Sequence, residues 1–143
     1  EAANGCNAEP TGQALQPVVT GEAESWLPAL DKIVGRRWLV THRVSSDDEL
    51  LEAVQTREVD AAVLDDAAQW SLDILKLLRM IRRLDAVLPV VVITGRCDRR
   101  WLEDALRLAV FSVISRPLEL EELLRQIQRM MIRLDRMLRG EMP

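Results

Sequence analysis

Side chains able to handle a phosphoryl group follow three short apolar runs of this 143-residue chain. Asp65 and Asp66 follow one run, Thr94 ends a second, and Arg116 comes just after a third. A carboxylate can accept the group, a hydroxyl can donate a hydrogen bond to its oxygens, and a cation can balance its charge. If the runs are strands of one parallel sheet, their carboxyl ends bring these residues to the same edge.

Five short apolar runs recur along the chain, and each is bounded by turn or polar residues. Most of them are apolar at consecutive positions, which is typical of strands buried on both faces of a parallel sheet. We therefore expect strands over 15–19, 38–40, 61–64, 90–93 and 110–114.

Helical patterns separate these runs. Ser46 opens a capping-box sequence, and Asp98 is a second candidate N-cap. Apolar residues recur at helical intervals within 71–85, and Gly35 is a suitable stop for a helix over 23–34. This regular alternation predicts a doubly wound α/β fold, in which one five-stranded parallel sheet lies between two layers of helices.

Four segments together resemble the receiver domains of bacterial two-component response regulators. They are 60–66 (DAAVLDD), 88–95 (LPVVVITG), 105–109 (ALRLA) and 113–124 (VISRPLELEELL). The resemblance covers about residues 15–128 and rests on the ordered set rather than on any one segment. It implies a flavodoxin-like three-layer sandwich and a role in signal transduction in the bacterial cytoplasm.

The resemblance also implies roles for single residues. Asp65 matches the phosphoacceptor aspartate of the family, and Thr94 matches its switch hydroxyl. Arg116 stands where the family has a lysine, before Pro117, whose peptide bond is often cis in receivers. We also expect an ion pair between Arg116 and Asp65, because this fold brings their strand ends together and an unpaired buried carboxylate is destabilising.

The sequence departs from the family at the metal site. The acidic pair that binds Mg²⁺ in receivers falls at Thr20 and Gly21, and neither residue is acidic. Mg²⁺ requires oxygen ligands in octahedral geometry, and Asp66 and Glu22 are the available substitutes. Val113 also stands in place of the switch aromatic residue. These losses predict a degenerate receiver that holds no metal and no other cofactor.

Several residues also have plain structural interpretations. Asp65 can serve as a helix cap or ion-pair partner, which we weigh equally with a residual phosphoacceptor role. His42 is expected at the surface, and Cys97 is expected to be an exposed thiol with no nearby base. Trp70 and Trp101 can fill the degenerate pocket or form a partner surface, although packing is the more common use of such residues.

The C-terminal segment carries a heptad pattern of apolar residues. We expect a long final helix that packs on the sheet in its first half and extends beyond the domain over 129–143, as a linker to a further module or as a pairing helix. Large apolar side chains left in water favour a homodimer. The pattern comprises Leu120, Leu124, Ile127, Met131, Leu134 and Leu138, and the last four form the expected dimer seam.

The composition excludes several classes of function. A net charge of -4 and a pI near 5.1 argue against direct binding of nucleic acid. No apolar run reaches the roughly 20 residues of a membrane span. The two cysteines and single histidine argue against a structural zinc site. Residues 1–14 are small and polar, which predicts a flexible leader before one domain at 15–128.

We interpret the chain as a non-enzymatic pseudo-receiver that signals through a protein partner or its own copy, without phosphorylation. The first alternative is a working receiver, phosphorylated on Asp65 by a histidine kinase or a small phosphodonor with Mg²⁺. Divalent-metal binding separates these two hypotheses. The second alternative is an unrelated flavodoxin-like enzyme or binder, although no glycine-rich phosphate loop follows the first run.

Overall fold

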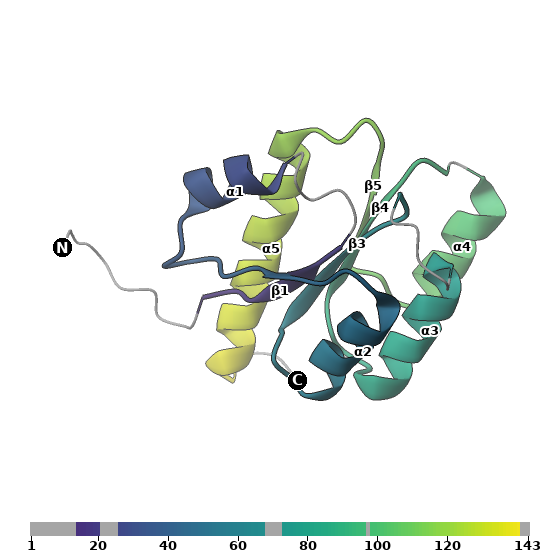
Figure 1. Cartoon of the computed structure of the whole chain (residues 1–143), viewed down its shortest axis with the longest axis horizontal. Coiled ribbons are helices and arrows are strands. Elements are labelled where there is room, and N and C mark those ends of the chain that lie inside the picture. The colour runs from purple at the N-terminus through teal and green to yellow at the C-terminus, as the bar shows by residue number, and fades with distance from the viewer. Residues whose placement is uncertain (1–13, 21–25, 68–72, 97, 141–143) are drawn as a thin grey trace.

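The computed structural model describes residues 14–20, 26–67, 73–96 and 98–140. Within them five strands form one parallel sheet in the order β2-β1-β3-β4-β5. Figure 1 labels β1, β3, β4 and β5 of this sheet. The chain runs from β1 outward to β2, returns past β1 to β3, and then continues to β4 and β5, so the doubly wound sheet is confirmed. The strands are β1 (Pro17–Val19), β2 (His42–Arg43), β3 (Ala61–Asp65), β4 (Val90–Thr94) and β5 (Ser112–Ser115).

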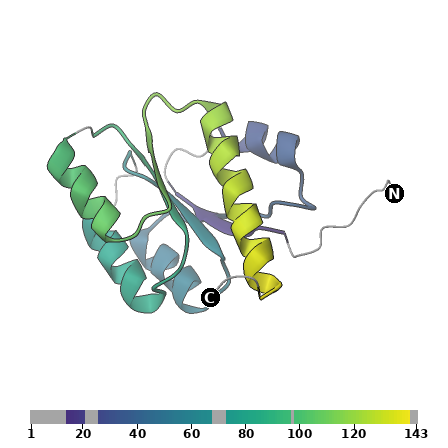
Figure 2. The same cartoon turned by 180° about the vertical axis from the view of Figure 1, so that it is seen from behind.

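Five helices cover the two faces of the sheet and complete the expected three-layer sandwich. The α1 and α5 helices lie on one face, whereas α2, α3 and α4 lie on the other (Figure 1 and Figure 2). None of the helices in the described residues is long and apolar enough to cross a membrane. The helices are α1 (Leu27–Val34), α2 (Asp47–Gln55), α3 (Ile74–Leu84), α4 (Arg99–Arg107) and α5 (Leu120–Leu138).

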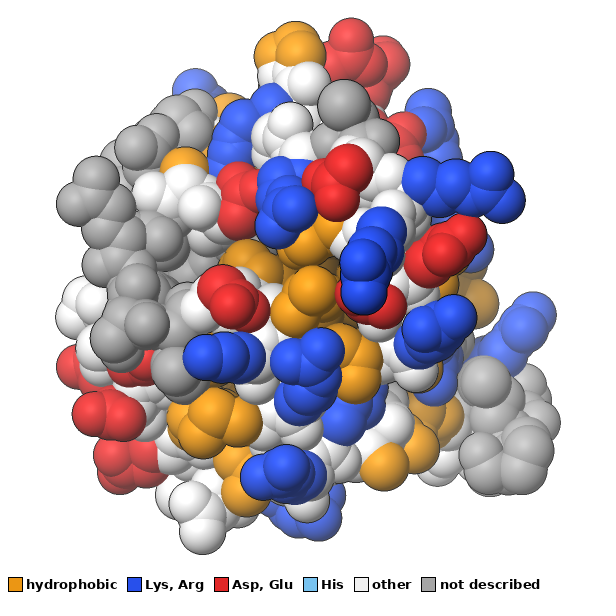
Figure 3. Space-filling model, turned by 90° about the vertical axis from the view of Figure 1, so that its right-hand side faces the viewer, with side chains coloured by type: hydrophobic (Ala, Val, Ile, Leu, Met, Phe, Trp, Pro, Cys, Tyr) orange, Lys and Arg blue, Asp and Glu red, His pale blue; other side chains and the backbone are white. Residues whose placement is uncertain are grey.

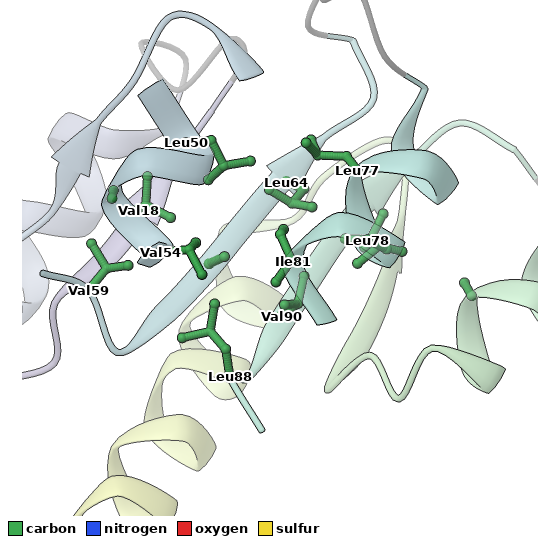
Figure 4. Close-up of a cluster of buried hydrophobic side chains, with 14 of the residues drawn as sticks. Val18, Leu50, Val54, Val59, Leu64, Leu77, Leu78, Ile81, Leu88 and Val90 are labelled. Carbon is green, nitrogen blue, oxygen red and sulfur yellow. The ribbon is translucent and has the colours of Figure 1, made fainter. Parts of the chain in front are cut away.

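Two apolar clusters, one on each face of the sheet, form the core. Successive side chains of a strand point to opposite faces, so β3 supplies Val63 to the cluster under α1 and α5 and Leu64 to the cluster under α2, α3 and α4. Figure 4 shows the second cluster, where Leu50 from α2 and Leu78 from α3 pack over the sheet. All residues of β3 and β4 are buried, which explains their consecutive apolar positions.

The second and fifth strands begin later than the sequence predicts. The run 38–40 contributes a single bridge, between Leu39 and Leu15, and the ladder of β2 with β1 comes after it. Leu39 is buried, whereas both of its neighbours are more than one third exposed. An edge strand pairs on one side and alternates between buried and exposed positions, so this run marks one core residue rather than a fully buried strand. At the other edge, β5 begins at residue 112 rather than 110.

Side-chain caps fix where three helices begin. Ser46 accepts a hydrogen bond from the Glu49 amide at 3.1 Å, and Asp73 and Asp98 cap α3 and α4 in the same way. The Glu49 carboxylate accepts from the amide of Ser45 rather than that of Ser46, so the expected capping box is shifted by one residue. The expected first helix, 23–34, is described from residue 27 onward.

Part of the second half of α5 packs on the chain's own core. Within the expected dimer seam, Ile127 is buried, and Met131 and Leu134 are partly buried against the cluster under α1 and α5. Only Leu138, which is 54% exposed, lies largely in water. The helix crosses the sheet far enough to bury Met130 completely (Figure 2). Three of the four seam residues therefore contact the chain's own core, and a dimer through this seam stays a prediction.

Arg82 ties the end of α3 to the end of α4. Its Nε donates to the carbonyl oxygen of Leu108 at 2.8 Å, and its Nη2 donates to that of Ala109 at 3.0 Å. Nη1 donates to the carbonyl of Asp85 at 3.2 Å. Burial lowers the pKa of the Arg82 guanidinium from its ordinary value. The side of α3 that carries Arg82 therefore faces α4.

Candidate functional site

The expected site residues meet at the carboxyl edge of the sheet. Asp65 and Thr94 are the last residues of β3 and β4, and both are buried. Thr20 follows β1, and Arg116 follows β5. Because β3 lies between β1 and β4 in the sheet, Asp65 is flanked by the two threonines, and Arg116 reaches it from beyond β4.

Thr20 holds two strands together. Its hydroxyl donates to the Val63 carbonyl at 3.4 Å and accepts from the Asp65 amide at 2.9 Å. The residue is only 2% exposed, so this hydroxyl is already occupied by backbone groups. Gly21, the other position of the expected acidic pair, lies outside the described residues.

Arg116 bridges the two carboxylates at the end of β3. Its Nη2 donates to Asp65 Oδ1, and the same nitrogen lies 2.9 Å from Asp66 Oδ1. The Asp65 side chain is 7% exposed and that of Arg116 is 30% exposed, so the pair is largely removed from water. Asp65 Oδ1 also accepts from the Ala67 amide at 2.9 Å. The expected ion pair between Arg116 and Asp65 is confirmed.

Asp66, rather than Asp65, is the partner of Thr94. The Thr94 hydroxyl donates to Asp66 Oδ2 at 2.5 Å, and the Gly95 amide donates to the same oxygen at 3.2 Å. The Thr94 oxygen in turn accepts from the Arg96 amide at 2.9 Å. The loop after β4 is therefore held to the end of β3 through Asp66.

The backbone at the end of β5 fixes the position of Arg116. The Arg116 amide donates to the Thr94 carbonyl at 2.9 Å, which continues the pairing of β5 with β4 by one residue. The Arg116–Pro117 peptide bond is cis, as the resemblance implied. Arg116 Nη1 is buried and has no hydrogen-bond partner among the described residues.

The described residues do not fit a Mg²⁺ site. They contain no cluster of three or more aspartate, glutamate, histidine or cysteine side chains. The two carboxylates that are present, Asp65 and Asp66, already share the Arg116 guanidinium. Thr20 contributes a hydroxyl that is engaged with backbone groups. A hard divalent cation needs several free oxygen ligands, and here a protein cation occupies two of them.

Other candidates have structural roles or lie outside the described residues. Trp101 is buried in the core under α4, and the Arg96 guanidinium lies 5.7 Å from its ring centroid. His42 is partly buried, with Nε2 at 3.0 Å from Gln16 Oε1. Val113 packs against the cluster under α2, α3 and α4. The structure does not describe Glu22, Trp70 or Cys97.

Sequence reasoning underestimated Asp66, which it treated as a neighbouring acid and a substitute metal ligand. The structure gives it three partners: the Thr94 hydroxyl, the Gly95 amide and the Arg116 guanidinium. The available signal was the doubled acid at a strand end, because adjacent carboxylates at that position require a cation or several donors nearby.

Comparisons with known proteins agree on one fold. A family model described as the response regulator receiver domain matches residues 21–128. A CheY-like receiver domain protein from Methanospirillum hungatei JF-1 superposes with a TM-score of 0.71 at 14% identity, covering 85% of this chain and 96% of its own. No curated protein matches the sequence.

Two further solved structures show the same likeness. The receiver domain of the sensor histidine kinase PA1611 from Pseudomonas aeruginosa PAO1, with a magnesium ion in its active-site cleft, gives a TM-score of 0.67 at 17% identity, covering 82% of this chain and 98% of its own. NtrX from Brucella abortus, in complex with ATP, gives 0.70 at 23% identity, covering 90% of this chain and 29% of its own. At these identities the likeness shows the fold alone.

Proposed function

Because this chain belongs to the family of response regulator receiver domains, we propose that it is a pseudo-receiver, which signals through protein contacts without phosphoryl transfer to Asp65. Receiver domains are generally signalling domains rather than enzymes. The observation that carries the proposal is the Arg116 guanidinium bridging Asp65 and Asp66. It supplies the positive charge that a metal ion would otherwise bring to this edge.

The bridge opposes phosphoryl transfer in two ways. An acceptor carboxylate attacks phosphorus with its negative charge, whereas Arg116 and the Ala67 amide both donate to Oδ1 of Asp65 and so reduce the charge on the whole carboxylate. Transfer also needs a cation that can coordinate the incoming oxygens, and a guanidinium cannot open a coordination position as Mg²⁺ does. The arginine guanidinium also differs from the compact lysine ammonium of the family, because it is more weakly hydrated and so suits an ion pair that is largely removed from water.

The same contacts favour one fixed arrangement of the loops at this edge. Asp66 contacts the Arg116 guanidinium, the Thr94 hydroxyl and the Gly95 amide. The loop after β4 is therefore held in place without a phosphoryl group on Asp65. Val113 replaces the aromatic residue of the family's switch, which removes the part that would change rotamer. The domain would therefore present a constant surface to a protein partner or to its own copy.

The working receiver remains the alternative, and one observation favours it. Asp65 and Thr94 end neighbouring strands, and both side chains are held at the edge where family members carry out phosphorylation. The receiver domain of PA1611 holds magnesium in its cleft, and Mg²⁺ would have to enter here by displacing Arg116. Family membership removes the other alternative, an unrelated enzyme or binder.

The test is chemical modification of Asp65. Wild-type protein and Asp65→Asn are incubated with acetyl phosphate, with and without Mg²⁺, and intact protein mass is measured. We expect neither protein to gain a phosphoryl group, because the guanidinium balances the charge of the Asp65 carboxylate and the described residues offer no metal site. Stoichiometric, Mg²⁺-dependent modification that Asp65→Asn abolishes would establish the working receiver instead.

Calorimetric titration with Mg²⁺ separates the role of Arg116 from that of the missing acids. Wild type should show no binding heat beyond dilution. Arg116→Lys keeps the charge but places it on a compact, strongly hydrated ammonium, so it should hold the two carboxylates less tightly. Weak Mg²⁺ binding that appears only in this variant would support the bridge as the cause of inactivity, whereas tight binding by wild type would contradict the proposal.

A further inference from the structure

Charge is segregated between the neighbouring helices α2 and α3. Every charged residue of α2 is acidic, and every charged residue of α3 is basic. The exposed acids include Asp48 and Glu52, one turn apart, and the exposed bases include Lys76, Arg79 and Arg83. None of these five side chains has an ion-pair partner within the described residues. Like charges one helical turn apart repel, so each helix carries an unbalanced stripe.

The two stripes lie side by side at the same level. Arg57 Nη1, just after α2, is 3.8 Å from Asp85 Oδ2, just after α3, which sets the ends of the helices level. Both helices rise by the same amount per residue. Counting back from the helix ends, Gln55 and Leu84, places Asp48 within about one turn of Lys76 along the helices, and Glu52 within about one turn of Arg79.

Apolar surface separates the stripes. Arg82 faces α4, and Met80 lies two residues earlier, so it points to the opposite side of α3, toward α2. Met80 is 36% exposed. Leu51 of α2 and Leu84 of α3 are only partly buried against the cluster beneath them. The face therefore runs from an acidic stripe across an apolar seam to a basic stripe. Figure 3 shows the neighbouring face, formed by α3 and α4, where basic side chains and some acidic ones surround hydrophobic side chains.

We propose that this α2–α3 face docks a second copy of the chain, about a two-fold axis that runs along the two helices between them. Such an axis sets α2 of one protomer against α3 of its partner, and it repeats the contact in reverse. Asp48 then meets Lys76 of the partner subunit, and Glu52 meets Arg79 of the partner subunit. The apolar surface between the two stripes meets the same surface of the partner on the axis. A two-fold axis across the helices would instead set acid against acid, so the charge pattern selects one arrangement.

A second copy fits this face better than a partner of one sign. A purely acidic partner would be repelled by α2, and a purely basic one by α3. A copy of this chain carries both stripes in the complementary order. The inference rests on the proposal that the domain acts through protein contacts, and it names the partner.

Sedimentation equilibrium at about 100 μM protein in low salt tests the arrangement. Wild type should be a dimer that weakens as salt rises, because the pairs are near the surface. Glu52→Lys and Arg79→Glu should each raise the dimer dissociation constant at least about tenfold. An equimolar mixture of the two variants should restore dimers, because each then supplies the charge that the other lacks. The double variant in one chain should also dimerise.

Matched controls reverse charges on the other face of the sheet. Asp31→Lys, on α1, and Arg36→Glu, just after α1, change the net charge equally at exposed positions and should leave the dissociation constant unchanged. A monomeric wild type, a dimer indifferent to Glu52→Lys and Arg79→Glu, or a mixture that fails to restore dimers would each overturn this inference. None of these results alters the phosphorylation and Mg²⁺ assays, so failure of this proposal and failure of the pseudo-receiver are distinguishable.

Discussion

Replacing Arg116 with methionine should destabilise the fold, because it leaves two neighbouring carboxylates without their cation. Removing one partner of a fully buried ion pair costs about 3–5 kcal/mol, whereas an exposed pair contributes less than about 1 kcal/mol. Here Asp65 is 7% exposed, Asp66 is 21% exposed and Arg116 is 30% exposed. The burial of this site lies between that of a fully buried pair and that of an exposed pair. We therefore expect a loss of about 2 kcal/mol in the free energy of unfolding.

Chemical denaturation and thermal unfolding measure this loss. For a chain of this size, about 2 kcal/mol corresponds to a fall of about 4–8 °C in Tm. A double-mutant cycle with Asp65→Asn isolates the pair, because asparagine keeps an oxygen for the Ala67 amide. The double variant Arg116→Met/Asp65→Asn should recover a large part of the loss.

The control is Arg36→Met, which removes an exposed arginine and should change stability by less than about 0.5 kcal/mol. If Arg116→Met were equally mild, or if the coupling with Asp65 were near zero, the guanidinium would not hold the carboxylates in solution. The proposed inactive site would then lose its physical basis.

Three further sets of substitutions test the packing of α5, a buried acid and the junction of α3 with α4. Leu123→Ala should cost about 2–5 kcal/mol because the side chain is fully buried, and Leu138→Ala less than about 0.5 kcal/mol. Equal losses in urea denaturation would contradict the packing of α5. Burial raises the pKa of Asp60 above its usual 3.8, so its contribution to stability is present below that pH and is lost as the pH rises through the folded-state value. Asp60→Asn keeps an acceptor for the Gln16 amide and should remove this slope from the pH profile of stability; an unchanged slope would refute the assignment. Arg82→Met deletes three hydrogen bonds to backbone carbonyls and should cost about 2 kcal/mol, and Arg82→Lys should recover less than half; a Met variant as stable as wild type would argue against that junction.

The central strands were predictable because their burial on both faces leaves a direct mark on the sequence. β3 and β4 are apolar at nearly every position and were predicted to within one residue. The edge strand β2 has no such mark, since only one of its sides pairs with a neighbour. The heptad pattern of α5 was real but ambiguous, because a helix crossing a wide sheet and a helix pairing with another helix both require apolar residues three and four apart.

The site was predictable in its location but not in its pairing. Parallel strands must end at the same edge, so Asp65, Thr94 and Arg116 had to lie near one another. Which carboxylate takes the Thr94 hydroxyl depends on how the chain turns after β3. The Asp66 amide donates to the Ile93 carbonyl, and that bond carries its side chain toward the end of β4. Adjacent residues of identical type give no sequence signal for this choice.

The packing of residues near both ends of the domain sets the minimum length of a fragment that can fold on its own. The family match spans 21–128, yet β1 lies before it and the fully buried Met130 lies after it. A fragment trimmed to the match would remove the strand between β2 and β3, leaving new unpaired edges open to aggregation. It would also empty a position in the core under α5. Expression, domain grafting and fusion design should therefore take their boundaries from burial, and include at least residues 15–134.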